Sequence, residues 1–183
     1  MNPPADASQA DPAASIPAAP ELSEVISQSL YVLIEQQPFF KGLNPRQLKL
    51  LTELALEIKF EPGQSIFAEG SPANRFYLIV EGEVVVESEK EDRDAIPVQT
   101  LGSGDALGWS WLFPPYYLHF SARAVKPTRT IFFYGTPLRE HCEQDHELGY
   151  QLMKRVAEVA TQSLQATQQR LMNFIATNTT PNA

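Results

Sequence analysis

The chain has 183 residues, of which 43% are hydrophobic, and its formal net charge is −8. This length suits one globular domain with a tail, and no apolar run is long enough to span a membrane. The 14 lysines and arginines form no basic run, which argues against direct nucleic-acid binding. The single cysteine, Cys142, excludes an intrachain disulfide. The N-terminus lacks the features of a signal peptide, so we expect a cytoplasmic protein.

The first part of the chain predicts a tail followed by two helices. Residues 1–22 are rich in Pro, Ala, Ser and Asp, and we expect them to be disordered because they offer little apolar surface to bury. Apolar residues recur at helical spacing through 23–37. A second helix is predicted after Asn44, which suits an N-cap, with Pro45 at the first helical position.

Residues 56–134 carry the pattern of a β-sheet domain. Short runs of alternating or wholly apolar residues, rich in β-branched and aromatic side chains, are separated by glycine, proline and charged turns. The clearest runs are 76–80, 84–87, 98–101 and 130–134. Their close spacing predicts an α+β fold: a double-stranded β-helix, or jelly-roll-like β-roll, with N-terminal helices and a long C-terminal helix.

The last predicted element is a single helix over residues 137–174 with two apolar stripes. One stripe, formed by Leu148, Leu152, Val156 and Val159, is expected to pack on the roll. The other alternates spacings of four and three, as in a coiled-coil seam, and predicts a homodimer. Its members are Met153, Ala157, Ala160, Leu164, Thr167, Leu171 and Phe174. The chain thus divides into a tail (1–22), helices and roll (23–137), a dimerisation helix (138–175) and a disordered end (176–183).

The segment FEPGQSIFAEGSPANRFYLIVEGEVVV, residues 60–86, resembles the cyclic nucleotide-binding domain of catabolite-activator-type regulators, protein kinase A regulatory subunits and cyclic-nucleotide-gated channels. Downstream, Leu101, Gly104 and Asp105 match the family's turn into its phosphate-binding cassette. The resemblance implies a regulatory role and, for the catabolite-activator type, dimerisation through the long helix. In that type a DNA-binding domain follows the helix, and we expect this chain to lack one.

The cassette departs from the family pattern in the residues that hold the ligand. The family has a glutamate that binds the ribose and an arginine that binds the cyclic phosphate. Here Trp109 follows Gly108 at the glutamate position, and the first cation after it is Arg123. A hydrogen bond to a charged group contributes about 1.5 to 3 kcal/mol, so losing two lowers affinity roughly a hundredfold to ten-thousandfold. We therefore expect weak or absent cyclic nucleotide binding in the usual manner.

Three interpretations of the former pocket remain open. The cassette aromatics, among them Trp109, Trp111 and Phe120, could fill it. A different small ligand could bind there, or a cyclic nucleotide could bind through a rearranged cassette that uses His119 or Arg123. The candidate ligand-binding residues are Gly108, Trp109, Ser110, Tyr117, His119 and Arg123.

The functional expectation is a non-enzymatic cytoplasmic regulator that senses a small ligand in this pocket. The alternatives are a ligand-independent adaptor with a protein partner, and a cyclic nucleotide binder with a rearranged phosphate site. No nucleophile elbow, P-loop or zinc-ligand spacing occurs, so we expect neither catalytic residues nor a metal. No cofactor is certain; a cyclic nucleotide or another small ligand is the candidate.

Overall fold

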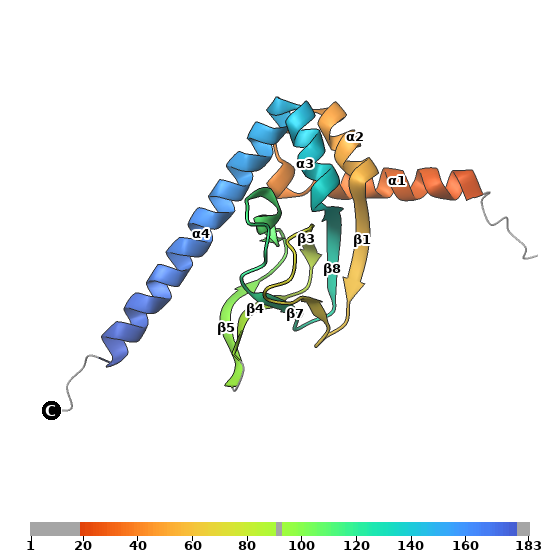
Figure 1. The fold of residues 1–183 in the computed structure, drawn as a ribbon. Helices are drawn as coiled ribbons and strands as arrows, with labels where there is room; N and C mark the ends of the chain where they lie inside the picture. The colour runs from red at the N-terminus through yellow and green to blue at the C-terminus, as the bar shows by residue number, and fades with distance from the viewer. Residues whose placement is uncertain (1–18, 91–92, 179–183) are drawn as a thin grey trace, which may run out of the picture.

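The computed structural model describes residues 19–90 and 93–178. Helices cover one end of a β-roll, and one long helix runs past the roll (Figure 1). The elements are α1 (Ala19–Glu35), η1 (Pro38–Phe40), α2 (Pro45–Leu54), β1 (Ala55–Phe60), β2 (Ser65–Phe67), β3 (Arg75–Glu81), β4 (Val84–Lys90), β5 (Arg93–Leu101), β6 (Ala106–Leu107), η2 (Trp109–Leu112), β7 (Ser121–Ala124), β8 (Thr128–Tyr134), α3 (Gly135–Gln144) and α4 (His146–Asn178).

Two four-stranded antiparallel sheets form the roll. The first has the order β1-β8-β3-β6, and the second has the order β2-β7-β4-β5. Because side chains alternate along a strand, the first sheet contributes to two apolar clusters. Phe76 and Leu78 of β3 pack with the helices, whereas Tyr77 and Ile79 pack against the second sheet. The predicted α+β roll with flanking helices is confirmed.

The N-terminal helices begin close to the predicted positions. Asn44 accepts a hydrogen bond from the Gln47 backbone, and the Gln47 side chain accepts one in return, which completes a capping box at α2. Helix α1 begins at Ala19, so residues 19–22 of the predicted tail are helical. Residues 1–18 of that tail, and residues 179–183 of the predicted disordered end, lie outside the described residues.

The prediction of one continuous C-terminal helix is wrong, because Asp145 separates α3 from α4. Asp145 has an extended backbone, and its carboxylate accepts a hydrogen bond from the Leu148 N–H at the start of α4. A Cβ at position 149 would lie 2.7 Å from the Cys142 carbonyl, so Gly149 permits the close approach of the two helices. The helix also continues to Asn178, beyond the predicted end at 175.

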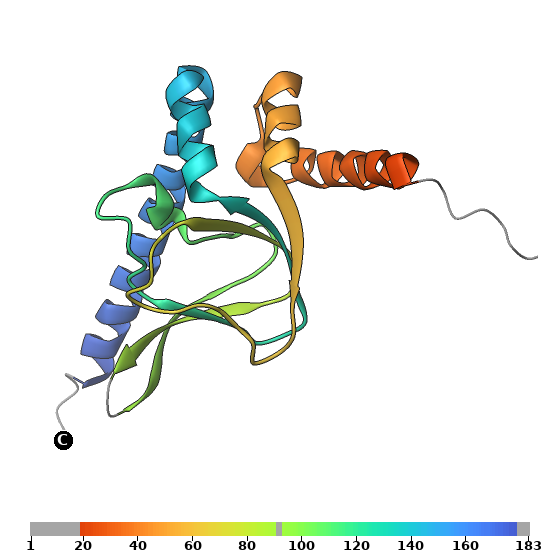
Figure 2. The same cartoon turned by 45° about the vertical axis from the view of Figure 1, so that its right-hand side comes forward.

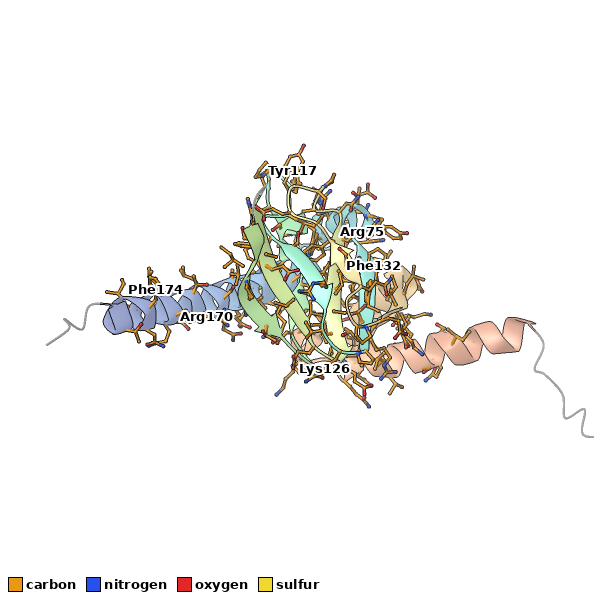
Figure 3. The ribbon with its side chains drawn as sticks, turned by 90° about the horizontal axis from the view of Figure 1, so that it is seen from below. Arg75, Tyr117, Lys126, Phe132, Arg170 and Phe174 are labelled. Atoms are coloured by element: carbon orange, nitrogen blue, oxygen red, sulfur yellow. The ribbon has the colours of Figure 1, made fainter. Side chains whose placement is uncertain are left out.

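Helix α4 joins the domain at its N-terminal end and extends beyond it at its C-terminal end. Leu148, Leu152 and Val156 are buried, as the first apolar stripe predicted. The later turns project past the roll, and Phe174 lies on this projecting part (Figure 3). Helices α1 and α4 leave the domain on opposite sides (Figures 1 and 3).

Candidate functional site

The cassette begins at a tight turn that places Gly108 against β3. Gly104 has φ +89°, and the Asp105 carboxylate accepts the Gly102 N–H at 2.8 Å, which stabilises the turn. Strand β6 then pairs with β3 and leads to Gly108, whose φ is +71°. A Cβ on Gly108 would lie 2.6 Å from the Arg75 carbonyl oxygen, so both the backbone angle and the contact require glycine.

The two tryptophans of η2 have different environments. Trp111 is fully buried in the core, with its ring 5.8 Å from that of Phe76, and its carbonyl accepts a hydrogen bond from Arg139. Trp109 is half-buried and lines a cavity. Trp111 therefore belongs to the core, while Trp109 is available to a ligand.

The aromatic segment after η2 packs on the outside of the roll. The Ala73 N–H donates to the Tyr116 carbonyl at 2.7 Å, and Tyr117 pairs with Pro72 in an isolated β-bridge. The Arg139 guanidinium lies 4.5 Å from the centre of the Tyr116 ring, a cation–π contact. Tyr117 points away from the roll (Figure 3) and is 52% exposed. Tyr116 and Tyr117 therefore do not fill the cavity beside the cassette.

A cavity of about 790 Å³ lies between the cassette and α4. The roll contributes mostly apolar side chains, and α4 contributes a polar wall along one side (Figure 2 shows α4 running beside the roll). From the cassette and strands come Phe67, Val86, Val98, Gln99, Leu101, residues 104–110, Leu118, His119 and Phe120. Pro38 and Phe39 come from η1, and Arg155, Glu158, Val159, Gln162, Ser163 and Ala166 from α4.

Two hydrogen bonds hold α4 against this cavity. The Arg155 guanidinium donates to the Lys41 carbonyl, which connects α4 to the loop after η1. The Ser163 hydroxyl donates to the Gln99 side-chain oxygen at 2.9 Å, which connects α4 to β5. Helix α4 is thus attached to the rest of the domain at two separate points beside the cavity.

The cavity has little capacity to bind an anion. Arg155 is the one lysine or arginine among its described lining residues, and its Nη1 already donates to the Glu158 carboxylate at 3.1 Å. The remaining charged lining residue, Asp105, is acidic. An arginine binds phosphate best through two parallel N–H groups, and here Nη1 donates to Glu158 and Nη2 to the Lys41 carbonyl.

Four of the six candidate ligand residues line the cavity: Gly108, Trp109, Ser110 and His119. Tyr117 is absent from the lining because it points outward. Arg123 lies on the outer face of the second sheet, because its neighbours Ala122 and Ala124 occupy the inward positions of β7. There its guanidinium pairs with Glu87.

The residues that α4 contributes to the cavity were not predicted from the sequence. Arg155, Glu158, Gln162 and Ser163 lie beside the buried stripe of Leu152 and Val156. That stripe was the available signal, since residues next to a helix's buried face lie at the edge of its contact with the domain.

The predicted dimer seam is accessible along α4. Met153, Leu164, Leu171 and Phe174 are each at least half exposed, Ala157 is exposed and Ala160 is half-buried. The described helices include none that is long and apolar enough to cross a bilayer. Within the described residues, no three His, Cys, Asp or Glu side chains gather as metal ligands.

The structure is that of a β-roll domain with a cavity bounded on one side by a C-terminal helix. The family model of the cyclic nucleotide-binding domain matches residues 57–145. A solved structure from Geobacter metallireducens, described as a cyclic nucleotide-binding protein, is 33% identical with a TM-score of 0.65, covering 75% of this chain and 97% of that one. The chain belongs to the cyclic nucleotide-binding domain family.

Two further similar proteins show the range of this family. A CRP-like cAMP-activated global transcriptional regulator from Mycobacterium tuberculosis is 25% identical over 146 residues, covering 80% of this chain. The chain spans 63% of that regulator's length. A regulatory subunit of a cAMP-independent protein kinase A from Trypanosoma cruzi, bound to guanosine, is 18% identical with a TM-score of 0.62. The matched regions cover 85% of this chain and 51% of the trypanosomal one, and at this identity the likeness shows the fold alone.

Proposed function

We propose that this protein is a non-enzymatic, cytoplasmic regulator that senses a small uncharged ligand in the cavity between the cassette and α4. The observation that carries the proposal is an open cavity of about 790 Å³ whose one described lysine or arginine is already bound by Glu158 and the Lys41 carbonyl. Ligand cavities in proteins commonly measure roughly 300 to 1,000 Å³ and combine apolar walls with a few polar groups.

The cavity lining favours a ligand with an aromatic or apolar body and neutral hydrogen-bonding groups. Trp109 and Phe120 offer aromatic surfaces, and Phe67, Leu107 and Leu118 offer apolar ones. Ser110, His119, Gln99, Gln162 and Ser163 supply groups that both donate and accept hydrogen bonds. A nucleoside is one example of this chemistry, and the trypanosomal subunit of similar fold is bound to guanosine.

A rearranged cyclic nucleotide site is less well supported. Arg123, which such a site would use, lies on the outer face of β7 with Glu87, so reaching the cavity would require breaking that pair. His119 lines the cavity as its remaining basic side chain besides Arg155, but one imidazole does not replace a guanidinium and a ribose-binding carboxylate.

Helix α4 connects the cavity to the dimer seam in this proposal. Residues such as Glu158 and Gln162 line the cavity, while Ala157, Leu164 and Leu171 lie on the face proposed to contact a second copy. A ligand that binds one position of α4 more tightly than another would shift the helix, and the seam would transmit that shift to the partner subunit.

A second candidate function is a ligand-independent adaptor. Phe113, Tyr116 and Tyr117 form an exposed aromatic group on the loop after η2, and the backbone bonds of that loop hold it in place. Exposed aromatic side chains are typical of protein-binding surfaces. In this role the cavity would need no occupant.

Thermal unfolding against a panel of neutral and anionic compounds separates these functions. A ligand at about 100 times its dissociation constant adds roughly 2.7 kcal/mol of stability. The sensor predicts stabilisation by a neutral compound, loss of this effect in Trp109→Ala or His119→Ala, and retention in Tyr117→Ala, which alters an exposed aromatic outside the cavity. Stabilisation that survives Trp109→Ala and His119→Ala would contradict the cavity as the site.

A further inference from the structure

Glu158 lies beside Arg155, which carries the one guanidinium among the described residues of the cavity lining. It lies on α4 one turn after Arg155, and its Oε2 is 3.1 Å from Arg155 Nη1. Both residues line the cavity, and the Arg155 side chain is the more buried of the two. The Arg155–Glu158 pair therefore belongs to the cavity wall as well as to the helix surface.

The geometry of this pair leaves Arg155 poorly able to bind a phosphate. One terminal nitrogen is directed to Glu158, and the other donates to the Lys41 carbonyl. A cyclic phosphate could still reach the other N–H groups of the guanidinium, but Glu158 already neutralises its charge. It would also approach the Glu158 carboxylate, and like charges at short range repel one another strongly in a partly desolvated site.

The loop after η1 lies beside the Arg155 guanidinium. Gly42 has φ +92°, and a Cβ there would lie 3.8 Å from Arg155 Nη2, in ordinary contact. The guanidinium is therefore held between α4 and the loop after η1, with the cavity beside it. Freed from Glu158, the Nη1 group would be available to an anion without movement of the helix.

We infer that Glu158 is the specificity-determining residue that excludes anionic ligands from the cavity, by neutralising and engaging Arg155. This inference rests on the proposed function only in taking the cavity as the ligand site. The cassette lacks cations, but α4 places the Arg155 guanidinium in the cavity wall. Selectivity against anions therefore depends on the Glu158 carboxylate, which pairs with that guanidinium.

The experiment measures the dissociation constants of cAMP and adenosine for wild type and Glu158→Gln, because these probes share a base and a sugar and differ in the cyclic phosphate. Removal of Glu158 is expected to raise cAMP affinity about tenfold or more, the effect of one added hydrogen bond to a charged group. Adenosine affinity should change little. Glu147→Gln removes the same charge from α4 outside the cavity and should change neither constant.

A double variant, Arg155→Gln with Glu158→Gln, tests whether the gain passes through Arg155. The cAMP gain should vanish in this variant, and its unfolding midpoint shows whether it remains folded. Unchanged cAMP affinity in a folded Glu158→Gln protein overturns the inference, and so does a gain that survives in the double variant. The proposed function fails separately, if wild type responds to no neutral compound while Glu158→Gln still gains cAMP.

Discussion

The Arg123 guanidinium donates two hydrogen bonds to the Glu87 carboxylate, at 3.0 and 2.8 Å, on the outer face of the second sheet. Glu87 is 7% exposed, so the Arg123 guanidinium is the partner that compensates for its limited contact with solvent. Arg123, the first cation after the cassette, is therefore paired on the second sheet and does not line the cavity.

Replacing Arg123 should lower stability and leave ligand selectivity unchanged. Arg123→Gln leaves the buried Glu87 carboxylate without its guanidinium, so the midpoint of thermal unfolding should fall. Lys126→Gln is the matched control, because the pair of Lys126 with Glu83 is exposed and such pairs contribute little. A changed cAMP response in Arg123→Gln would instead indicate that Arg123 reaches the ligand.

Gly108 and Gly70 provide a paired test of the cassette turn. Their φ angles are similar, +71° and +74°, but a Cβ at position 70 meets no atom within 4 Å. Gly70→Ala should therefore cost only the left-handed backbone strain, about 1 to 2 kcal/mol. Gly108→Ala should cost about 1 to 3 kcal/mol more, because the new methyl group overlaps the Arg75 carbonyl. Chemical denaturation measures both, and equal losses would contradict the close contact.

The seam on α4 predicts a homodimer that a single charged substitution at the seam should dissociate. Leu164 is 58% exposed and lies at the centre of the repeating pattern. A glutamate there would be buried between two helices, so Leu164→Glu should sediment as a monomer while the unmodified protein sediments as a dimer. Gln165→Glu adds the same charge at a neighbouring exposed position and should leave the dimer intact. A monomeric wild type would refute the seam.

Cys142 should react slowly with thiol reagents in the folded protein. Burial, and then the nearby charges of Asp145 and Glu143, raise the pKa of the Cys142 thiol to about 11. The thiolate is the reactive form, so its fraction at pH 8 should be about a hundredfold lower than for a free cysteine. Labelling should accelerate with pH up to about 11 and become fast after denaturation. Rapid labelling of the folded protein at pH 8 would show that α3 separates from α4.

Local patterns predicted most of the fold, because the relevant interactions are close in sequence. The cap at Asn44 and the buried stripe from Leu148 to Val156 are both read from spacing within one element. The break at Asp145 was missed because the 3.6-residue period continues through Gly149. A local signal was present, since Asp145 is a residue that suits an N-cap and its carboxylate accepts the Leu148 N–H. The close approach of Gly149 to the Cys142 carbonyl depends on the packing of the two helices, which the period does not show.

The site was predictable only in part, for the same reason. Gly108, Trp109, Ser110 and His119 come from one continuous segment, and the sequence places them together. Arg155 and Glu158 reach the cavity through the packing of a distant helix, which periodicity along α4 does not position relative to the cassette. Strand alternation predicts that Arg123 points outward, because its neighbours Ala122 and Ala124 point into the roll.

Calorimetric titration of the wild-type protein with cAMP tests most directly whether this cavity has lost the binding mode of its family. Because Glu158 neutralises the one guanidinium among the described lining residues, we predict no saturable heat at micromolar concentrations and a dissociation constant of about a millimolar or weaker. Saturable binding with a micromolar dissociation constant would contradict the account, because it would require an anion site that the cavity lining does not provide.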